Sequence, residues 1–193
     1  MGQPRFRLAV AASLALAGHA GATDIPIGGW KLTIIDKLAT AGIARTVFTS
    51  KDPSVGVGSG TDPSQIEATF TVKYDSTSGT YLMPAGSNWL RNEIRFAKYA
   101  NRFAPSGGAV KLSIIRTDQI LKVAARSLGD VPIDISTPPS GSVHVAYTLD
   151  NAGIVTRYCS QFADCTHSVI PGGGSKLVCR HGGDDPSCAA AVP

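Results

Sequence analysis

The chain has 193 residues, of which 43% are hydrophobic and 17% are charged, and it contains 21 glycines and 12 prolines. Charged residues lie below the usual share of about 25%, and glycine with proline lies above the usual share of about 12%, which is typical of short strands joined by many turns. The formal net charge is +4, but the 18 Lys and Arg residues occur singly, with no basic run that could follow a phosphate backbone, so we expect no nucleic-acid partner.

The first 22 residues have the pattern of an export signal. Arg5 and Arg7 precede an apolar run over residues 8–17, and Ala20-Gly21-Ala22 matches the small-x-small pattern before a cleavage site. The apolar run is shorter than the roughly 20 residues that a membrane-spanning helix needs. We therefore expect a signal peptide over residues 1–22 and one secreted or periplasmic domain over residues 23–193, with no membrane span. Its 16 basic and 14 acidic residues give the mature chain a net charge of only +2.

Alternating polar and apolar residues predict strands along most of the mature chain. The most regular segment is 65–74, in which Ile66, Phe70 and Tyr74 share one face. Similar segments are 30–35, 43–50, 80–83, 110–115, 120–126, 143–149 and 154–162, with a turn at 75–79 and a brief apolar stretch at 133–135. For residues 88–102 we favour a strand around 94–98, with a short helix as the alternative.

These segments predict the fold class. Turn signals recur every ten or so residues, and no amphipathic helix of convincing length appears. We expect an all-β fold, an antiparallel β-sandwich of the jelly-roll or Ig-like kind, with a closed barrel as the alternative.

All four cysteines lie in a C-terminal tail, residues 159–188. An even number of cysteines in an exported chain predicts disulfides. Segments 166–170 and 175–178 flank a glycine-rich loop and predict a hairpin that sets Cys165 opposite Cys179. The remaining pair is then Cys159 with Cys188, so we expect a disulfide-stapled C-terminal hairpin.

A metal site is the alternative use of two of these sulfurs. Cys165 with His167 and Cys179 with His181 form paired Cys-x-His units, which a hairpin would bring together as a Cys2His2 tetrahedron. The chain lacks the usual Cys-x2–4-Cys spacing, and an oxidising compartment favours the disulfide. We therefore expect no metal and no cofactor.

Residues for a catalytic site are scarce. His144 lies on the polar face of a predicted strand, where a solvated histidine is the expected state. The chain contains no Gly-x-Ser-x-Gly elbow and no His-Glu-x-x-His motif. We expect no catalytic residue and predict a non-catalytic module with a binding or structural role.

The candidate ligand site is an exposed Trp89 with Arg91, Glu93 and Arg95, because an aromatic platform beside charged groups suits sugars or anionic glycans. The partner is otherwise unknown, and a glycan or a cell-surface component is the candidate. Trp89 in the protein core is the alternative.

Two short motifs carry a first family resemblance. The segment 91–95, Arg-Asn-Glu-Ile-Arg, resembles the Arg-Ser/Thr-Glu-Leu/Val-Arg strand of alginate-lyase-type polysaccharide lyases, which are secreted β jelly rolls. Gln65-Ile66-Glu67 echoes their Gln-Ile/Val-His, with Glu67 in place of the histidine and the two motifs in reverse order. The resemblance implies a lyase-like, polysaccharide-acting enzyme as the alternative function.

A second resemblance covers nearly the whole mature chain. Its motifs include Lys-Leu-Thr-Ile at 31–34, Arg-Thr-Val-Phe at 45–48, Val-Lys-Leu-Ser-Ile at 110–114 and Arg-Tyr-Cys at 157–159. The chain resembles a family of secreted bacterial β-sandwich modules that end in an Arg-Tyr-Cys…Cys tail and have no assigned activity. This resemblance implies a secreted β module, and it supports the pairing of Cys159 with Cys188.

Overall fold

The computed structural model describes residues 22–37, 42–57, 65–92, 95–101, 110–128, 133–185 and 188. The expected signal peptide, up to residue 21, lies outside the described residues. The described residues form thirteen strands: β1 (Thr23–Pro26), β2 (Gly29–Lys37), β3 (Ile43–Ser50), β4 (Ile66–Tyr74), β5 (Thr77–Met83), β6 (Trp89–Asn92), β7 (Phe96–Ala100), β8 (Val110–Arg116), β9 (Ile120–Leu128), β10 (Val143–Asn151), β11 (Ile154–Phe162), β12 (Cys165–Val169) and β13 (Ser175–Asp184).

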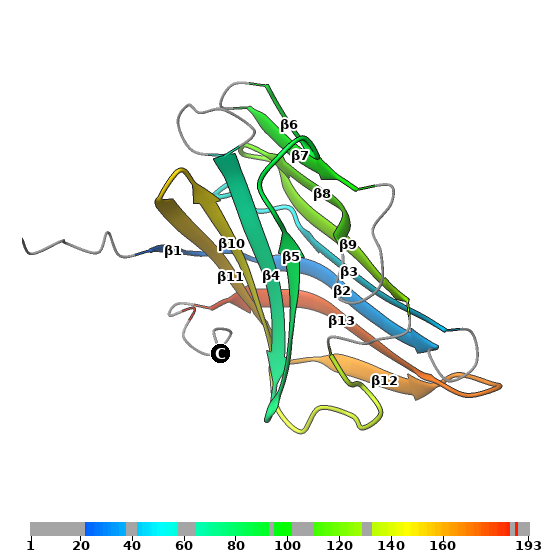
Figure 1. Cartoon of the computed structure of the whole chain (residues 1–193). Helices are drawn as coiled ribbons and strands as arrows, with labels where there is room; N and C mark the ends of the chain where they lie inside the picture. The colour runs from blue at the N-terminus through cyan, green and yellow to red at the C-terminus, as the bar shows by residue number, and fades with distance from the viewer. Residues whose placement is uncertain are drawn as a thin grey trace, which may run out of the picture.

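All thirteen strands belong to one hydrogen-bonded sheet with the order β5-β4-β10-β11-β13-β2-β3-β9-β8-β7-β6. β12 pairs with β13 beside this path, and β1 pairs in parallel with β11, whereas the other pairings are antiparallel. The sheet curls into a half-barrel (Figure 1). The predicted all-β antiparallel class is therefore confirmed.

The sheet is weakest in hydrogen bonding between β11 and β13. Only two residue pairs join them, Ser160 with Asp184 and Gln161 with Gly183. We call β5-β4-β10-β11 the small half and β13-β2-β3-β9-β8-β7-β6 the large half. In Figure 1 the strands of the small half cross in front of those of the large half.

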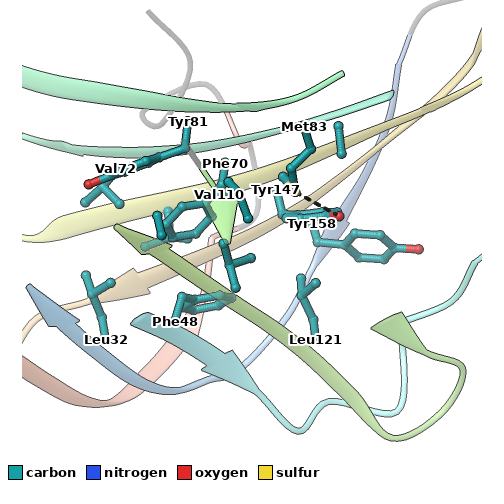
Figure 2. Packing of buried hydrophobic residues seen from close by; sticks show 14 of the residues in the cluster. Leu32, Phe48, Phe70, Val72, Tyr81, Met83, Val110, Leu121, Tyr147 and Tyr158 are labelled. Carbon is teal, nitrogen blue, oxygen red and sulfur yellow. Dashed lines mark hydrogen bonds between the residues drawn. The ribbon is translucent and has the colours of Figure 1, made fainter. Parts of the chain in front are cut away.

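An aromatic cluster fills the space between the two halves (Figure 2). Phe48 of β3 stacks on Phe70 of β4 with ring centroids 5.6 Å apart, and the Phe162 ring of β11 meets Phe48 edge-on at 6.3 Å. All three side chains are fully buried. Burying a phenylalanine side chain stabilises a fold by about 1.5–3 kcal/mol. These contacts therefore hold the two halves together at a place where few backbone hydrogen bonds join them.

Two buried tyrosines add hydrogen bonds across the core. The Tyr81 hydroxyl of β5 lies 2.5 Å from the Thr46 hydroxyl of β3, and the Tyr147 hydroxyl of β10 lies 3.0 Å from the Ser113 hydroxyl of β8. Each pair therefore joins the small half to the large half. Burial raises the pKa of Tyr81 to about 12, with the Thr46 bond opposing the rise, so this hydroxyl stays neutral at physiological pH.

Most predicted strands are confirmed. The strand favoured within residues 88–102 is present as β7, with β6 before it, and two other details differ. The predicted turn at 75–79 shortens to Asp75-Ser76, because β5 already begins at Thr77. The apolar stretch 133–135 forms no strand, although Ile133 and Ile135 are fully buried.

A pair of glycines lets β13 pass from β2 to β11. Gly29 of β2 and Gly182 of β13 lie opposite each other, and both face the ring of Phe162. A Cβ atom would lie 2.4 Å from Phe162 Cζ at Gly29, and 2.8 Å from Phe162 Cδ1 at Gly182. Only glycine allows the aromatic ring to approach the backbone this closely.

We predict that Gly29→Ala destabilises the protein by about 1–3 kcal/mol, because the added methyl group overlaps a fully buried ring. Urea unfolding at neutral pH measures this loss. Gly183→Ala on the neighbouring strand is the matched control, since nothing lies within 4 Å of its Cβ position. An equal loss in both variants would contradict the importance of the close packing at Phe162.

Candidate functional site

Basic side chains gather on the outer face of the large half. Leu32 and Ile34 of β2 are buried, so the residues that alternate with them point outward. Lys31 lies opposite Arg180 of β13, and the outward positions continue across β3 to Arg45. The outward positions of β9, β8 and β7 carry further basic residues on the same face of the sheet. The basic face comprises Lys31, Lys37, Arg45, Lys98, Lys111, Arg116, Lys122, Arg126, Lys176 and Arg180.

Within the described part of these strands, the outward positions hold no acidic residue. Asp36 of β2 occupies an inward position, opposite the buried Ala44 and Ser175. Half-buried apolar side chains such as Ile35 and Val47 separate the cations. The face therefore combines one sign of charge with a partly apolar floor, an arrangement that attracts anions.

Shallow hollows run across this face. One of about 240 Å³ lies between β2 and β3 and is lined by Lys31 and Arg45, among others. A second, of about 300 Å³, adds Lys111 and Arg126 and shares Arg45. A third, of about 500 Å³, lies beside β12 at the edge of the face and is lined by Arg180 together with the exposed Asp164 of the adjoining loop. Neighbouring strands are about 4.8 Å apart, so the row from β9 to β12 extends about 19 Å, which suits a polymer better than a small anion.

The basic face was not predicted from the sequence, because its residues are spread singly from Lys31 to Arg180. The available signal was that many lysines and arginines occupy the same polar positions of alternating segments. Their gathering depends on which strands become neighbours. Which strands become neighbours is decided by pairing between segments far apart in the sequence, such as β2 and β13.

The expected exposed platform at Trp89 is wrong, and the alternative of a core position holds. Trp89 is only 3% exposed, and its ring packs against Tyr99 with centroids 5.2 Å apart. Its indole N–H donates a hydrogen bond to the Pro84 carbonyl at 3.1 Å. A buried tryptophan with a satisfied N–H is part of the core and offers no surface to a ligand.

The charged residues predicted beside Trp89 form no described site. Glu93 lies outside the described residues, and only the backbone of Arg91 is described, in β6. Arg95 is exposed in the turn before β7. Glu67, from the other lyase-like motif, is exposed on β4 opposite Asp150. The two motifs therefore lie on strands that are not neighbours in the sheet.

The exposed tryptophan is Trp30, with 47% of its surface accessible. It lies next to Lys31, at the end of the basic face. The Lys51 ammonium lies 4.3 Å from the centroid of its ring, and the His181 ring meets it edge-on at 5.3 Å. We call Trp30, Lys51 and His181 the aromatic corner. A hollow of about 330 Å³ lies among these three residues and the adjoining loop.

Asp52 fixes the loop that carries Lys51. Its carboxylate accepts hydrogen bonds from the backbone N–H groups of Gly28 and Ser54 at 2.8 and 2.7 Å. Partial burial by itself raises the pKa of this carboxyl, but the hydrogen bonds to Gly28 and Ser54 outweigh burial and lower it. Asp52 therefore stays charged beside the aromatic corner.

The cysteine hairpin forms the predicted disulfide. Cys165 and Cys179 face each other in register and are bonded, with Cα atoms 4.2 Å apart. The expectation that a hairpin brings His167 and His181 together is wrong. In an antiparallel pair His167 faces Leu177, four positions from His181, or about 13 Å along the strand. Among the described residues no group of three metal-ligating side chains occurs.

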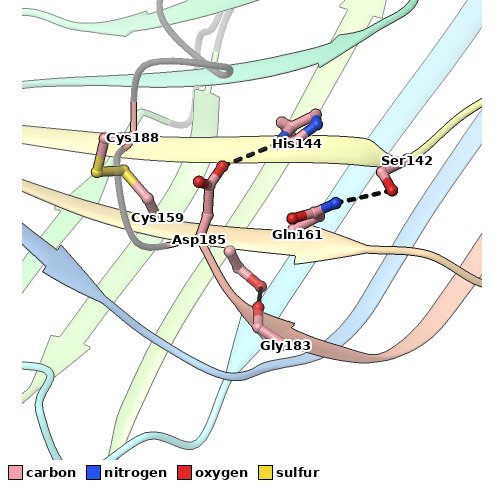
Figure 3. A network of polar contacts seen from close by, with 8 residues as sticks. Ser142, His144, Cys159, Gln161, Gly183, Asp185 and Cys188 are labelled. Atoms are coloured by element: carbon pink, nitrogen blue, oxygen red, sulfur yellow. Dashed lines mark hydrogen bonds and ion pairs between the residues drawn. A yellow bond between two sulfur atoms is a disulfide. The ribbon is translucent and has the colours of Figure 1, made fainter.

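The second predicted disulfide, Cys159–Cys188, is also present and ties the end of the chain to β11. Figure 3 shows a second attachment beside it, in which His144 Nδ1 lies 2.8 Å from Asp185 Oδ2. The description of His144 as a solvated histidine is wrong, because its side chain is only 20% exposed and binds a buried carboxylate. Both disulfides indicate an oxidising compartment.

No protein-family model matches the chain, and comparisons with curated proteins and with solved structures find no match either. In the part of the chain that the structure describes, no helix has the length and apolar character that crossing a membrane requires.

We predict that replacing Cys165 and Cys179 together by serine destabilises the protein by about 3 kcal/mol, because the bond closes a loop of 14 residues in the unfolded chain. Urea unfolding of the two proteins measures the difference. Peptide mapping without reductant is expected to recover Cys165–Cys179 and Cys159–Cys188. A Cys159–Cys165 peptide would contradict the pairing.

We predict that Asp52→Asn lowers stability at pH 7 by less than about 1 kcal/mol, since the carboxylate is only partly buried and solvent screens its charge. The pKa of Asp52 is depressed in the folded state, so its contribution is present above the unfolded pKa of about 3.9 and is lost as the pH falls through the folded pKa. The difference in unfolding free energy between the two proteins should therefore be present at pH 7 and should shrink at pH 2.5. A difference that does not depend on pH would contradict the prediction.

Proposed function

We propose that this protein is an exported, non-catalytic binding module that holds an acidic glycan against its basic face. The observation that carries this proposal is the gathering of ten basic side chains, with no acidic residue at the outward positions between them in the described strands. A surface of one sign attracts a polymer of the opposite sign and retains it through many weak contacts.

The export part of the proposal rests on the signal-like residues 1–22 and on the two disulfides, which persist in oxidising compartments. The resemblance to secreted bacterial β modules supports the same location. We further propose that the curled sheet is a variant of the β-sandwich, of the jelly-roll or Ig-like kind. Its support is the packing of Phe48 from one half on Phe70 from the other.

The non-catalytic part rests on what the described side chains are already doing. His144 is bound to Asp185, His167 Nε2 lies 3.0 Å from the Ile135 carbonyl oxygen, and His181 packs on Trp30. A hydrolase or lyase needs a base placed beside a nucleophile, a metal or a substrate. Each described histidine instead has a structural contact.

A glycan is the occupant that the face fits best. Its hollows are lined by threonines and aliphatic side chains between the cations, as with Thr33, Val47 and Thr49. Sugar rings offer hydroxyl groups and apolar C–H faces beside their charges, and this mixed chemistry matches such a lining. The absence of a nucleic-acid partner stays a prediction, and the comparison with DNA below tests it.

We predict that Arg45→Glu weakens retention on immobilised alginate about tenfold, because replacing attraction by repulsion at the centre of the face costs about 1–2 kcal/mol. Lys73→Glu, on β4 of the small half, changes the net charge equally and is the matched control. Retention measured by salt elution should fall for the first variant only. Equal loss in both variants would show an effect of net charge and overturn the proposed face.

Two parallel measurements separate the competing functions. Absorbance of the unsaturated product of β-elimination, during incubation with alginate, reports lyase activity. Turnover that Glu93→Gln abolishes would overturn the binding module in favour of the lyase alternative. Tighter retention on double-stranded DNA than on alginate, at the same salt concentration, would replace the glycan by a nucleic acid.

A further inference from the structure

We propose that the aromatic corner is a sugar-stacking subsite at the end of the basic face, and that it makes the protein select acidic polysaccharides over polyanions without sugar rings. This inference rests on the proposed function, since it names what that same surface recognises. It assigns to Trp30 the platform role that the sequence suggested for Trp89.

Two backbone irregularities build the corner. The register of β2 against β3 shifts between Gly29 and Lys31, so Trp30 is the extra residue of a bulge. Opposite it, His181 of β13 has a φ of +52°, a left-handed conformation that residues other than glycine rarely adopt. Bulges turn side chains in new directions and are frequent beside functional sites.

These irregularities reverse the usual alternation on both strands. Gly29 and Gly182 face the core at Phe162, while Trp30 and His181 are exposed. Lys31 and Arg180 point outward, so regular alternation would have turned the adjacent rings of Trp30 and His181 inward. The chain therefore presents at its surface two aromatic rings that a regular sheet would bury.

The corner contains the groups that recognition of an acidic sugar requires. The exposed indole offers a flat apolar surface for the C–H face of a sugar ring. The Lys51 ammonium, held beside this ring, supplies a cation for a sugar carboxylate. Asp52 lines the same hollow, and its charged carboxylate accepts hydrogen bonds from sugar hydroxyls.

The corner is continuous with the basic face. Trp30 directly precedes Lys31 and His181 directly follows Arg180, and Lys31 and Arg180 are paired in register. The hollow beside β12 includes Arg180 and His181, and the hollow of the corner also includes His181. A polymer lying across the cations therefore reaches Trp30 at its end.

Tryptophan fluorescence provides a direct test, because the chain has two tryptophans and only Trp30 is exposed. The full mature protein is titrated with an oligogalacturonate and, separately, with a polyglutamate of the same number of carboxylates. We expect the oligogalacturonate to bind about tenfold more tightly and to protect Trp30 from quenching by acrylamide. Polyglutamate should bind with little protection.

The variants isolate the ring. Trp30→Ala should weaken oligogalacturonate binding about tenfold and leave polyglutamate binding unchanged, whereas Trp30→Phe should retain most of the preference. Leu82→Ala, at a 61% exposed position on β5, is the matched control for loss of a large exposed side chain. It should leave the binding of both polymers unchanged.

Failure of the inference and failure of the proposed function give different results. Equal affinity for both polymers, with no effect of Trp30→Ala, would overturn the sugar-stacking subsite and leave the basic face as a general anion-binding surface. Absence of binding to either polymer at low salt would overturn both. Loss of polyglutamate binding in Trp30→Ala would also overturn the inference, because the ring would then act on charge alone.

Discussion

The close packing of the Phe162 ring against Gly29 and Gly182 is the contact on which the rest of the structure depends. At this point β13 leaves β2 and joins β11, and only two residue pairs connect the halves of the sheet there. Side chains at either glycine position would push β13 away from the ring and open this corner. The closed aromatic core at this corner therefore depends on the two glycines.

The parts of the fold that depend on local pattern were predictable from the sequence. The alternation over 65–74 gave β4, and the glycine-rich loop between Cys165 and Cys179 gave the hairpin and its disulfide. Neighbour relations between distant strands were not predictable, since no local pattern pairs β2 with β13. The two tryptophans show the same limit. Trp89 is buried because Tyr99 and Pro84 surround it, and Trp30 is exposed because of a bulge.

The outer faces of the two halves are used differently. On the small half, the disulfide Cys159–Cys188 and the contact between His144 and Asp185 fasten the tail of the chain over β10 and β11 (Figure 3). Cys188 also buries Ala146 of β10 there. On the large half, alternate strand positions carry the cations of the basic face. The fold thus anchors its C-terminal tail on one outer surface and presents its charge on the other.

The uneven placement of charge makes the molecule an electrical dipole. Glu67 and Asp150 lie side by side on the outer face of the small half, opposite in direction to the cations of the large half. The small net charge gives little attraction at a distance, but a dipole experiences a torque near any charged surface. If the protein binds an acidic glycan as proposed, such a torque would turn its large half toward the polymer before contact. A larger fraction of encounters would then begin with the basic face toward the polymer.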